Sequence, residues 1–138
     1  MALGRNAKVE LIKQVPLFSR CTRKELAEVA SIADEIDLPA GRVLMREGER
    51  GREFVVLLKG AADVRRNGRK VNSLGDGDFF GEIALVSRSV RTATVTTTAP
   101  SRALVIREQA FRALLDHAPQ IQIRVLEALA DRLAPSTL

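Results

Sequence analysis

One glycine, one carboxylate and one guanidinium give this sequence its clearest chemical signal. Gly81 precedes Glu82 and the short apolar run 83–85, and Arg91 stands nine residues after Glu82. An apolar run that follows a glycine predicts a single helical turn, whose first N–H groups have no partner within the helix and attract an anion. The planar guanidinium of Arg91 offers donors that suit a phosphate. We therefore expect an anion-binding site in this segment.

Glu82 adds a second requirement to that site. Because a carboxylate does not favour an anion, its expected partner is a hydroxyl donor such as a sugar. A phosphate beside a ribose indicates a nucleotide. The structural alternatives are an ion pair between Glu82 and Arg91 at the rim of a sheet and, for Gly81, an ordinary turn glycine.

Composition narrows the class of protein. A chain of 138 residues with 46% hydrophobic residues suits one domain, 1–138, with a sizeable core. No apolar run is long enough for a membrane helix, and the start carries no signal-peptide pattern. The single cysteine and single histidine, Cys21 and His117, argue against a disulfide framework or a His/Cys metal site and fit the cytoplasm. The net charge of +5 favours anionic ligands, while the absence of Trp and Tyr argues against single-stranded nucleic acid.

Helical periodicity is confined to the two ends of the chain. Apolar residues at helical spacing predict a helix over 5–15, and the capping box Thr22-x-x-Glu25 predicts a second one that runs to about residue 34. Near the other end, 108–116 is helical in pattern and Pro119 begins a last helix. The apolar stripe of that last helix consists of Ile121, Val125, Leu126, Leu129 and Leu133.

Between these ends, short runs of β-forming residues alternate with turns that contain glycine. The expected strands are 36–38, 43–45, 54–58, 62–65, 70–74, 92–98 and 103–106. Asn67-Gly68 is the strongest hairpin signal. Many short strands at regular spacing predict a mixed α and β chain: an antiparallel jelly-roll β-barrel of about eight strands, with two N-terminal and two C-terminal helices.

The segment 80–95 carries a resemblance to a known family. It reads Phe80-Gly81-Glu82-Ile83-Ala84-Leu85-Val86-Ser87-Arg88-Ser89-Val90-Arg91-Thr92-Ala93-Thr94-Val95. This run resembles the phosphate-binding cassette of cyclic-nucleotide-binding domains, the sensor modules of cyclic AMP receptor proteins, cyclic-nucleotide-dependent kinases and cyclic-nucleotide-gated channels. The resemblance covers nearly the whole chain. Val90 replaces a frequent proline, so the loop is expected to be looser. Arg88 replaces a small residue, which is expected to change the loop conformation. Neither replacement removes a ligand-contacting residue type.

The resemblance implies a role for each residue of the cassette. Glu82 would accept the ribose 2′-hydroxyl, and Arg91 would pair with the cyclic phosphate, helped by the N–H groups of Ile83, Ala84 and Thr92. Gly81 would let the ligand approach closely. The last helix would form a lid over the base, with Leu126, Leu129 and Leu133 as its candidate contacts.

The resemblance also implies an organisation: helices in 1–34, a β-barrel in 35–107 that contains the cassette 80–95, and hinge and lid helices in 108–134. The expected function is that of a non-enzymatic cytoplasmic receptor that couples binding to movement of the C-terminal helix and acts on a downstream protein, without metal, membrane segment or direct DNA binding. The ligand would be cyclic AMP or cyclic GMP. Thr92 is similar to what cyclic-GMP-preferring members carry, and cyclic AMP is nevertheless the expected ligand.

Other functions remain open at this stage. A degenerate jelly-roll domain that only binds proteins would keep the fold, although Glu82 and Arg91 argue against it. An enzyme of the cupin type would need a set of histidines, and the chain has His117 alone. The sequence does not decide the oligomeric state, or whether the chain acts alone or belongs to a longer protein.

Overall fold

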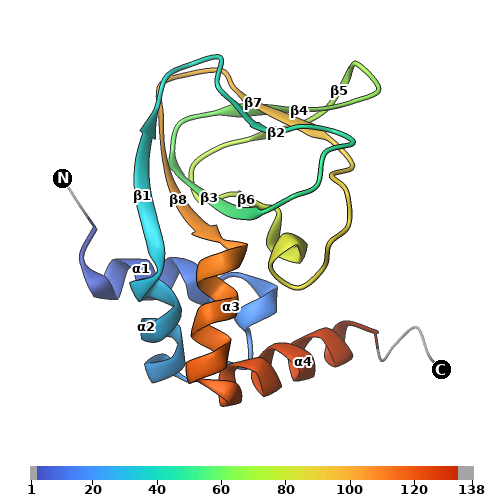
Figure 1. Cartoon of the computed structure of the whole chain (residues 1–138). Coiled ribbons are helices and arrows are strands. Elements are labelled where there is room, and N and C mark those ends of the chain that lie inside the picture. The colour runs from blue at the N-terminus through green and yellow to red at the C-terminus, as the bar shows by residue number, and fades with distance from the viewer. Residues whose placement is uncertain (1–2, 134–138) are drawn as a thin grey trace. The chain divides into compact units, whose positions relative to one another are not determined.

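The computed structural model describes residues 3–133, and the chain divides into two compact units. The sheet unit comprises 34–108, and the helical unit comprises the chain before residue 34 together with the chain after residue 108. Figure 1 labels the elements of both units along the chain.

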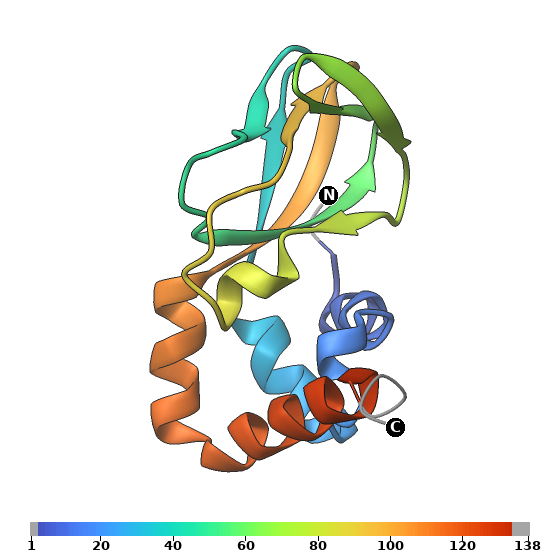
Figure 2. The ribbon, with the colours of Figure 1, turned by 90° about the vertical axis from the view of Figure 1, so that its right-hand side faces the viewer.

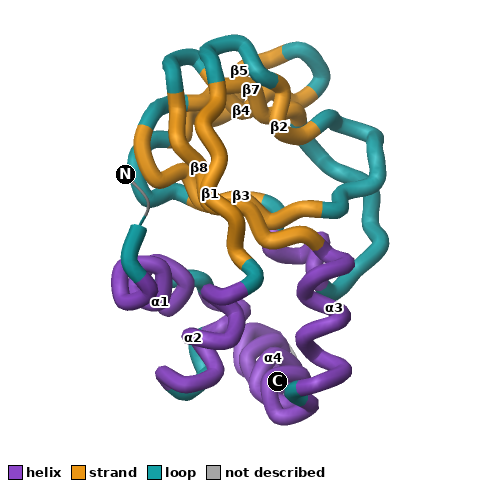
Figure 3. Tube along the Cα trace, turned by 60° about the vertical axis from the view of Figure 1, so that its left-hand side comes forward, coloured by secondary structure: helices purple, strands orange, loops and turns teal. Residues whose placement is uncertain are grey.

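The sheet unit contains two four-stranded sheets. The first has the order β1-β8-β3-β6, with β1 at Ala33–Leu38, β8 at Ser101–Arg107, β3 at Glu53–Lys59 and β6 at Phe79–Phe80. The second has the order β2-β7-β4-β5, with β2 at Val43–Met45, β7 at Thr94–Thr97, β4 at Ala62–Arg66 and β5 at Arg69–Leu74. Figure 3 shows the two sheets as separate layers of strands. The pairings of β3 with β6 and β8, and of β7 with β4 and β2, are antiparallel.

Side chains from both sheets meet in an apolar cluster. Leu38, Val55, Ala103 and Val105 of the first sheet are buried, and Leu44 of β2 packs against them. β3 supplies the largest apolar run, because Phe54 through Leu57 are all at most 3% exposed. A strand between two neighbours, with both faces covered, is expected to lose the alternation of polar and apolar residues in this way. The segments that flank β3 are therefore attached to a strand that is buried between β8 and β6.

The hairpin predicted at Asn67-Gly68 is confirmed. Arg66 pairs with Arg69, and the two turn residues have φ values of 53° and 76°, as a two-residue turn of this kind requires. The strand predicted at 92–98 is shorter in the structure, since β7 begins only at Thr94. The strand β6 was not predicted, because two residues are too few to show an alternating pattern.

The helical unit contains α1 at Arg5–Lys13, the 3₁₀ turn η1 at Pro16–Phe18, α2 at Arg23–Ser31, α3 at Glu108–His117 and α4 at Pro119–Leu133. The predicted capping box is confirmed: Glu25 N–H donates to Thr22 Oγ1 at 3.2 Å, and Thr22 N–H donates to Glu25 Oε1 at 2.7 Å. The helix that it starts ends at Ser31 and not near residue 34, because β1 begins at Ala33. The segment 16–18 forms the turn η1, which the helical periodicity did not predict.

Apolar contacts and ion pairs hold this unit together. The rings of Phe18 and Phe111 meet edge to face at 5.8 Å, which ties η1 to α3. Arg20 binds the carboxylate of Asp131 through two hydrogen bonds of 2.6 and 2.9 Å. In Figure 2, α3 and α4 meet at a sharp bend, where Pro119 begins the second helix. Among residues 3–133, no helix has both the length and the apolar character that a membrane crossing requires.

Candidate functional site

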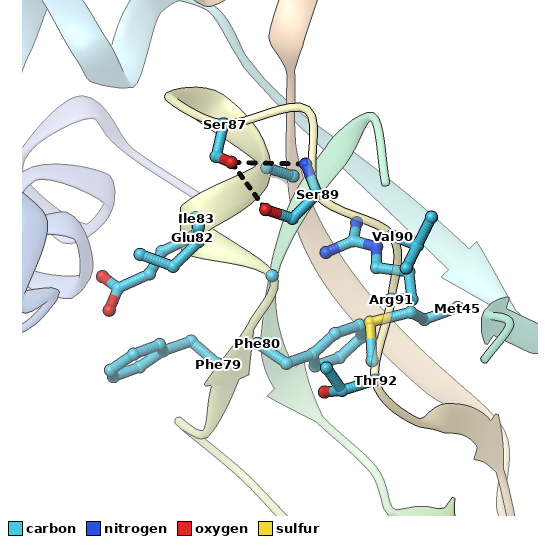
Figure 4. A pocket seen from close by; sticks show the side chains of 12 residues that line it. Met45, Phe79, Phe80, Glu82, Ile83, Ser87, Ser89, Val90, Arg91 and Thr92 are labelled. Carbon is cyan, nitrogen blue, oxygen red and sulfur yellow. Dashed lines mark hydrogen bonds between the residues drawn. The ribbon is translucent and has the colours of Figure 1, made fainter. Parts of the chain in front are cut away.

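A pocket of about 440 Å³ lies in the sheet unit and gathers the residues that carry the sequence signal. Figure 4 shows its lining from close by, with β6, the turn η2 at Glu82–Leu85 and the loop that follows. Met45 of β2 completes it. All of the predicted ligand-contacting residues line this pocket: Gly81, Glu82, Ile83, Ala84, Arg91 and Thr92. Segments separated in the sequence thus come together around one space.

Gly81 and η2 form the helical turn that the apolar run predicted. Gly81 has a φ of 82°, a conformation that L side chains rarely adopt, so glycine is required at the start of the turn. The first hydrogen bond of the turn runs from Ala84 N–H to the Gly81 carbonyl at 3.0 Å. Because that bond is the first, the N–H groups of Glu82 and Ile83 precede the internal bonding of the turn. Glu82 and Ile83 both line the pocket.

The backbone of Arg91 is fixed by the loop between β2 and β3. Arg91 N–H donates to the Glu49 carbonyl at 2.7 Å, and Gly48 N–H donates to the Arg91 carbonyl at 2.8 Å. One residue earlier, Val90 forms an isolated bridge with Arg50. The loop therefore holds Arg91 by its main chain, even though the cassette lacks the frequent proline before the arginine.

The guanidinium of Arg91 is half-buried and has a neutral partner. Its Nη2 donates to the backbone carbonyl of Glu53. Within the described part of the chain, Arg91 forms no ion pair with any carboxylate. Burial lowers the pKa of Arg91 from its ordinary value, and the charge of the Glu53 carboxylate partly opposes this shift. A desolvated cation without a counter-charge is stabilised by an anion that enters the pocket.

Glu82 lines the same pocket and does not neutralise Arg91. The structure records no ion pair between the two side chains, and in Figure 4 the Glu82 carboxylate points away from the Arg91 guanidinium. The structural alternative considered for this pair, an ion pair at a sheet rim, is therefore not what the chain forms. Arg91 stays available to a ligand.

Apolar and hydroxyl groups complete the lining. Ile83 and Val90 are 43% and 58% exposed, and Met45 and Phe79 lie on the same pocket. Within the loop, the hydroxyls of Ser87 and Ser89 share a hydrogen bond of 2.7 Å, and Ser89 N–H donates to Ser87 Oγ. An aromatic ring of a ligand can pack on the apolar part, while its charged group meets Arg91.

Some residues of the site were not predicted from the sequence. Gly51 packs against the Arg91 side chain, Glu53 supplies the carbonyl that accepts from it, and Met45 reaches the pocket from another sheet. Gly51 lies between two arginines just before β3 and carries no turn signature. The pairing of 48–50 with 90–91 could not be inferred, because it depends on how the two sheets pack.

The predicted lid residues belong to α4. Leu126 and Leu133 are 59% and 63% exposed, whereas Ile121 and Val125 of the same helix are buried. Leu129 lies between these extremes as a half-buried residue. The apolar stripe of α4 is thus only partly used by the core of the helical unit, which leaves apolar surface on the helix.

Comparison with known proteins gives the site its context. The family model described as "Cyclic nucleotide-binding domain" matches residues 35–118, which include the whole pocket. The chain belongs to the cyclic nucleotide-binding domain family. A cAMP-dependent protein kinase regulatory subunit from Mycosarcoma maydis is 34% identical over 115 residues, which cover 77% of this chain and 22% of that protein. The cGMP-dependent protein kinase egl-4 from Caenorhabditis briggsae is 29% identical over 114 residues, or 78% of this chain and 15% of that protein.

A solved structure extends the similarity to nearly the full length of this cyclic nucleotide-binding domain. The N-terminal domain of a transcriptional regulator from Streptomyces coelicolor has a TM-score of 0.80 and 26% identity, and the match covers 92% of each chain. The chain spans less than a third of the length of the kinase relatives, so it corresponds to one part of those proteins. Among the described residues there is no cluster of three or more His, Cys, Asp or Glu side chains that could hold a metal ion.

Proposed function

We propose that this chain is a non-enzymatic receptor for a cyclic nucleotide, and that the pocket beside Gly81 and Arg91 is its binding site. The observation that carries the proposal is the half-buried Arg91 guanidinium, which has a neutral carbonyl partner and no paired carboxylate. A cation in this position is costly without an anion and strongly stabilising with one. The volume of about 440 Å³ falls within the range of pockets that hold small molecules.

Each part of the nucleotide has a partner of suitable chemistry. The cyclic phosphate binds Arg91 and the N–H groups of Ile83 and Thr92. The Ala84 N–H donates to the Gly81 carbonyl and would share its hydrogen between that carbonyl and the phosphate. Glu82 accepts the ribose 2′-hydroxyl after its side chain turns toward the pocket, a rotamer change of the kind that ligand binding commonly brings. The base packs on the apolar lining near Ile83 and Val90.

Cyclic AMP is the proposed ligand over cyclic GMP, because the cAMP-dependent relative is 34% identical to this chain and the cGMP-dependent relative 29%, although Thr92 offers a contact to cyclic GMP. Thr92 is exposed and lines the pocket, so its hydroxyl is free to bond a guanine amino group. One such hydrogen bond contributes about 1 kcal/mol net, which is less than tenfold in affinity. The named relatives include a cAMP-dependent and a cGMP-dependent kinase, so both nucleotides belong in the test.

Helix α4 is proposed to cover the bound base. Its exposed residues Leu126 and Leu133, with the half-buried Leu129, offer apolar surface to a purine. If α4 covers the base, it would bind the nucleotide-loaded sheet unit more tightly than the empty one. This difference in affinity would couple nucleotide binding to movement of α4. The signal would pass to a downstream protein in the cytoplasm, without direct DNA binding.

The remaining features of the proposal concern organisation. We propose that the two sheets close as a jelly-roll barrel and that 1–138 acts as a single domain, with helices in 1–34, the barrel in 35–107 around the cassette 80–95, and hinge and lid helices in 108–134. The part of 108–134 beyond Leu133 lies outside the described residues. A protein-interaction module that binds no nucleotide would keep this fold, but its half-buried Arg91 charge would have no anionic partner.

Calorimetric titration of the full chain, unfolded and refolded to remove any retained nucleotide, tests the proposal. We expect micromolar or tighter binding of cyclic AMP and weaker binding of cyclic GMP, with 5′-AMP as the control ligand that lacks the cyclic phosphate. Heat from neither cyclic nucleotide, together with an unchanged thermal midpoint, would contradict the receptor function and favour the interaction module.

A further inference from the structure

The Arg91 side chain lies directly against a glycine from a distant part of the chain. A Cβ added at Gly51 would come within 2.8 Å of Arg91 Cδ and even closer to Nε and Cζ, well below the 3.0 Å that Cβ contacts essentially never violate. Gly51 is buried and its φ does not lie in the left-handed range, so its backbone would accept other residues. Space for Arg91, and not conformation, is therefore the reason for glycine at this position.

A second glycine limits the space around the terminal nitrogens of the guanidinium. A Cβ added at Gly81 would lie 2.6 Å from Arg91 Nη1 and 2.8 Å from the Glu53 carbonyl oxygen. That carbonyl is the acceptor of the bond from Arg91 Nη2. Gly51, Gly81 and the Glu53 carbonyl thus lie close against the Arg91 side chain, and we call the space between them the arginine slot.

We infer that Gly51 is a positioning residue for the nucleotide site: it holds the Arg91 guanidinium in the arginine slot so that its remaining N–H groups face the pocket. An arginine side chain has many rotamers in solution, and fixing it before binding removes most of the entropy cost of ordering it on the ligand. This inference rests on the proposed function for its effect on affinity, whereas the slot itself is a property of the ligand-free protein.

The variant Gly51→Ala tests the inference, because a methyl group suffices to fill the slot. In the refolded full chain, we expect its dissociation constant for cyclic AMP to rise about 10- to 100-fold, by analogy with metal sites, where loss of the partner that orients a metal-binding side chain weakens metal affinity by this range. Gly75→Ala is the matched control. A Cβ at Gly75 would meet nothing within 4 Å and its φ is ordinary, so cyclic AMP affinity should not change.

A double-mutant cycle separates positioning from a general effect on the fold. If Gly51 acts through Arg91, Gly51→Ala should change affinity by less than about twofold once Arg91→Met is already present. An unchanged affinity in Gly51→Ala alone would overturn the inference. So would an equal loss in both backgrounds, because it would show that the alanine disturbs the fold and not the arginine.

A measurement on the ligand-free protein tests the arginine slot separately from the proposed function. In ¹⁵N-labelled protein without nucleotide, the Arg91 Nε–H resonance, identified by its loss in Arg91→Met, should shift in Gly51→Ala and stay in place in Gly75→Ala. If Gly51→Ala does not fold, the wild-type protein provides the test. A guanidinium held in the arginine slot rotates slowly and should give separate Nη signals for Arg91, whereas one averaged signal would overturn the inference. Failure of the wild type to bind cyclic nucleotides would contradict the proposed function. The NMR measurement on the ligand-free protein would then still test whether Gly51 positions the Arg91 side chain.

Discussion

Two arginines of the sheet unit border hollows of similar size and yet differ in their charge partners. Arg91 lines the pocket of about 440 Å³ and donates to a neutral carbonyl. Arg102 of β8 lines a hollow of about 500 Å³ together with Asp37 and Lys59, and its guanidinium lies 3.2 Å from Glu35 and 3.6 Å from Asp37. The hollow at β8 thus holds an arginine whose charge is already paired.

Charge balance, and not volume, distinguishes the two hollows, and it is the reason we propose the pocket at Arg91 as the ligand site. The Arg102 pairs join β8 to β1 within one sheet, which is a structural use of the cation. Arg91 makes no such pair, and burial lowers its pKa. Since a lowered pKa means that the folded state holds the proton less well than the unfolded state, the charge on Arg91 opposes folding at neutral pH until an anion arrives.

The matched pair Arg91→Met and Arg102→Met should separate the two uses of arginine with the largest effects. We expect Arg91→Met to weaken cyclic AMP binding by about 2–4 kcal/mol, because the buried phosphate loses its counter-charge. Its thermal midpoint without ligand should equal or exceed that of the wild type. Calorimetric titration and thermal unfolding measure the two effects.

Arg102→Met should give the opposite pattern. Loss of the guanidinium removes the counter-charge of the largely buried Glu35 and lowers the free energy of unfolding by about 1–3 kcal/mol, while cyclic AMP affinity stays unchanged. Denaturant titration gives the stability. A loss of affinity in Arg102→Met comparable to that in Arg91→Met would remove the distinction between the two hollows.

Leu126→Ala tests the proposed contribution of α4 to the site. Removing most of an apolar side chain from contact with the base should weaken cyclic AMP binding by about 1 kcal/mol. Ile123→Ala is the control on the same helix, with a side chain that is also exposed, at 56% against 59% for Leu126. Equal losses in both variants would show a general effect on α4, and no loss in Leu126→Ala would count against the lid.

Thr92→Ala should produce an effect confined to cyclic GMP. Loss of the hydroxyl should weaken cyclic GMP by about 1 kcal/mol, under tenfold, and leave cyclic AMP unchanged. Parallel titrations of the two nucleotides measure the ratio. A similar loss for both ligands would assign the Thr92 hydroxyl to the phosphate, which the two nucleotides share.

The sequence predicted the local features of the site better than the distant ones. The elements of the site that are close in sequence, Gly81, the helical turn after it and Arg91, were predicted from their spacing. The capping box at Thr22 and the Asn67-Gly68 hairpin were predicted in the same way. Gly51 and the Glu53 carbonyl were not predicted, because a glycine without a turn signature and a backbone acceptor leave no pattern in residue types. The different roles of Arg91 and Arg102 could not be predicted either, since their partners come from other strands.

The most direct test of the account is a crystal structure of the refolded chain with cyclic AMP. The account predicts a phosphate oxygen within about 3.2 Å of the Arg91 guanidinium, with the ribose 2′-hydroxyl at Glu82 and Arg102 still paired with Glu35. A nucleotide whose phosphate lies out of hydrogen-bonding distance of Arg91, or in the hollow beside Arg102, would contradict it.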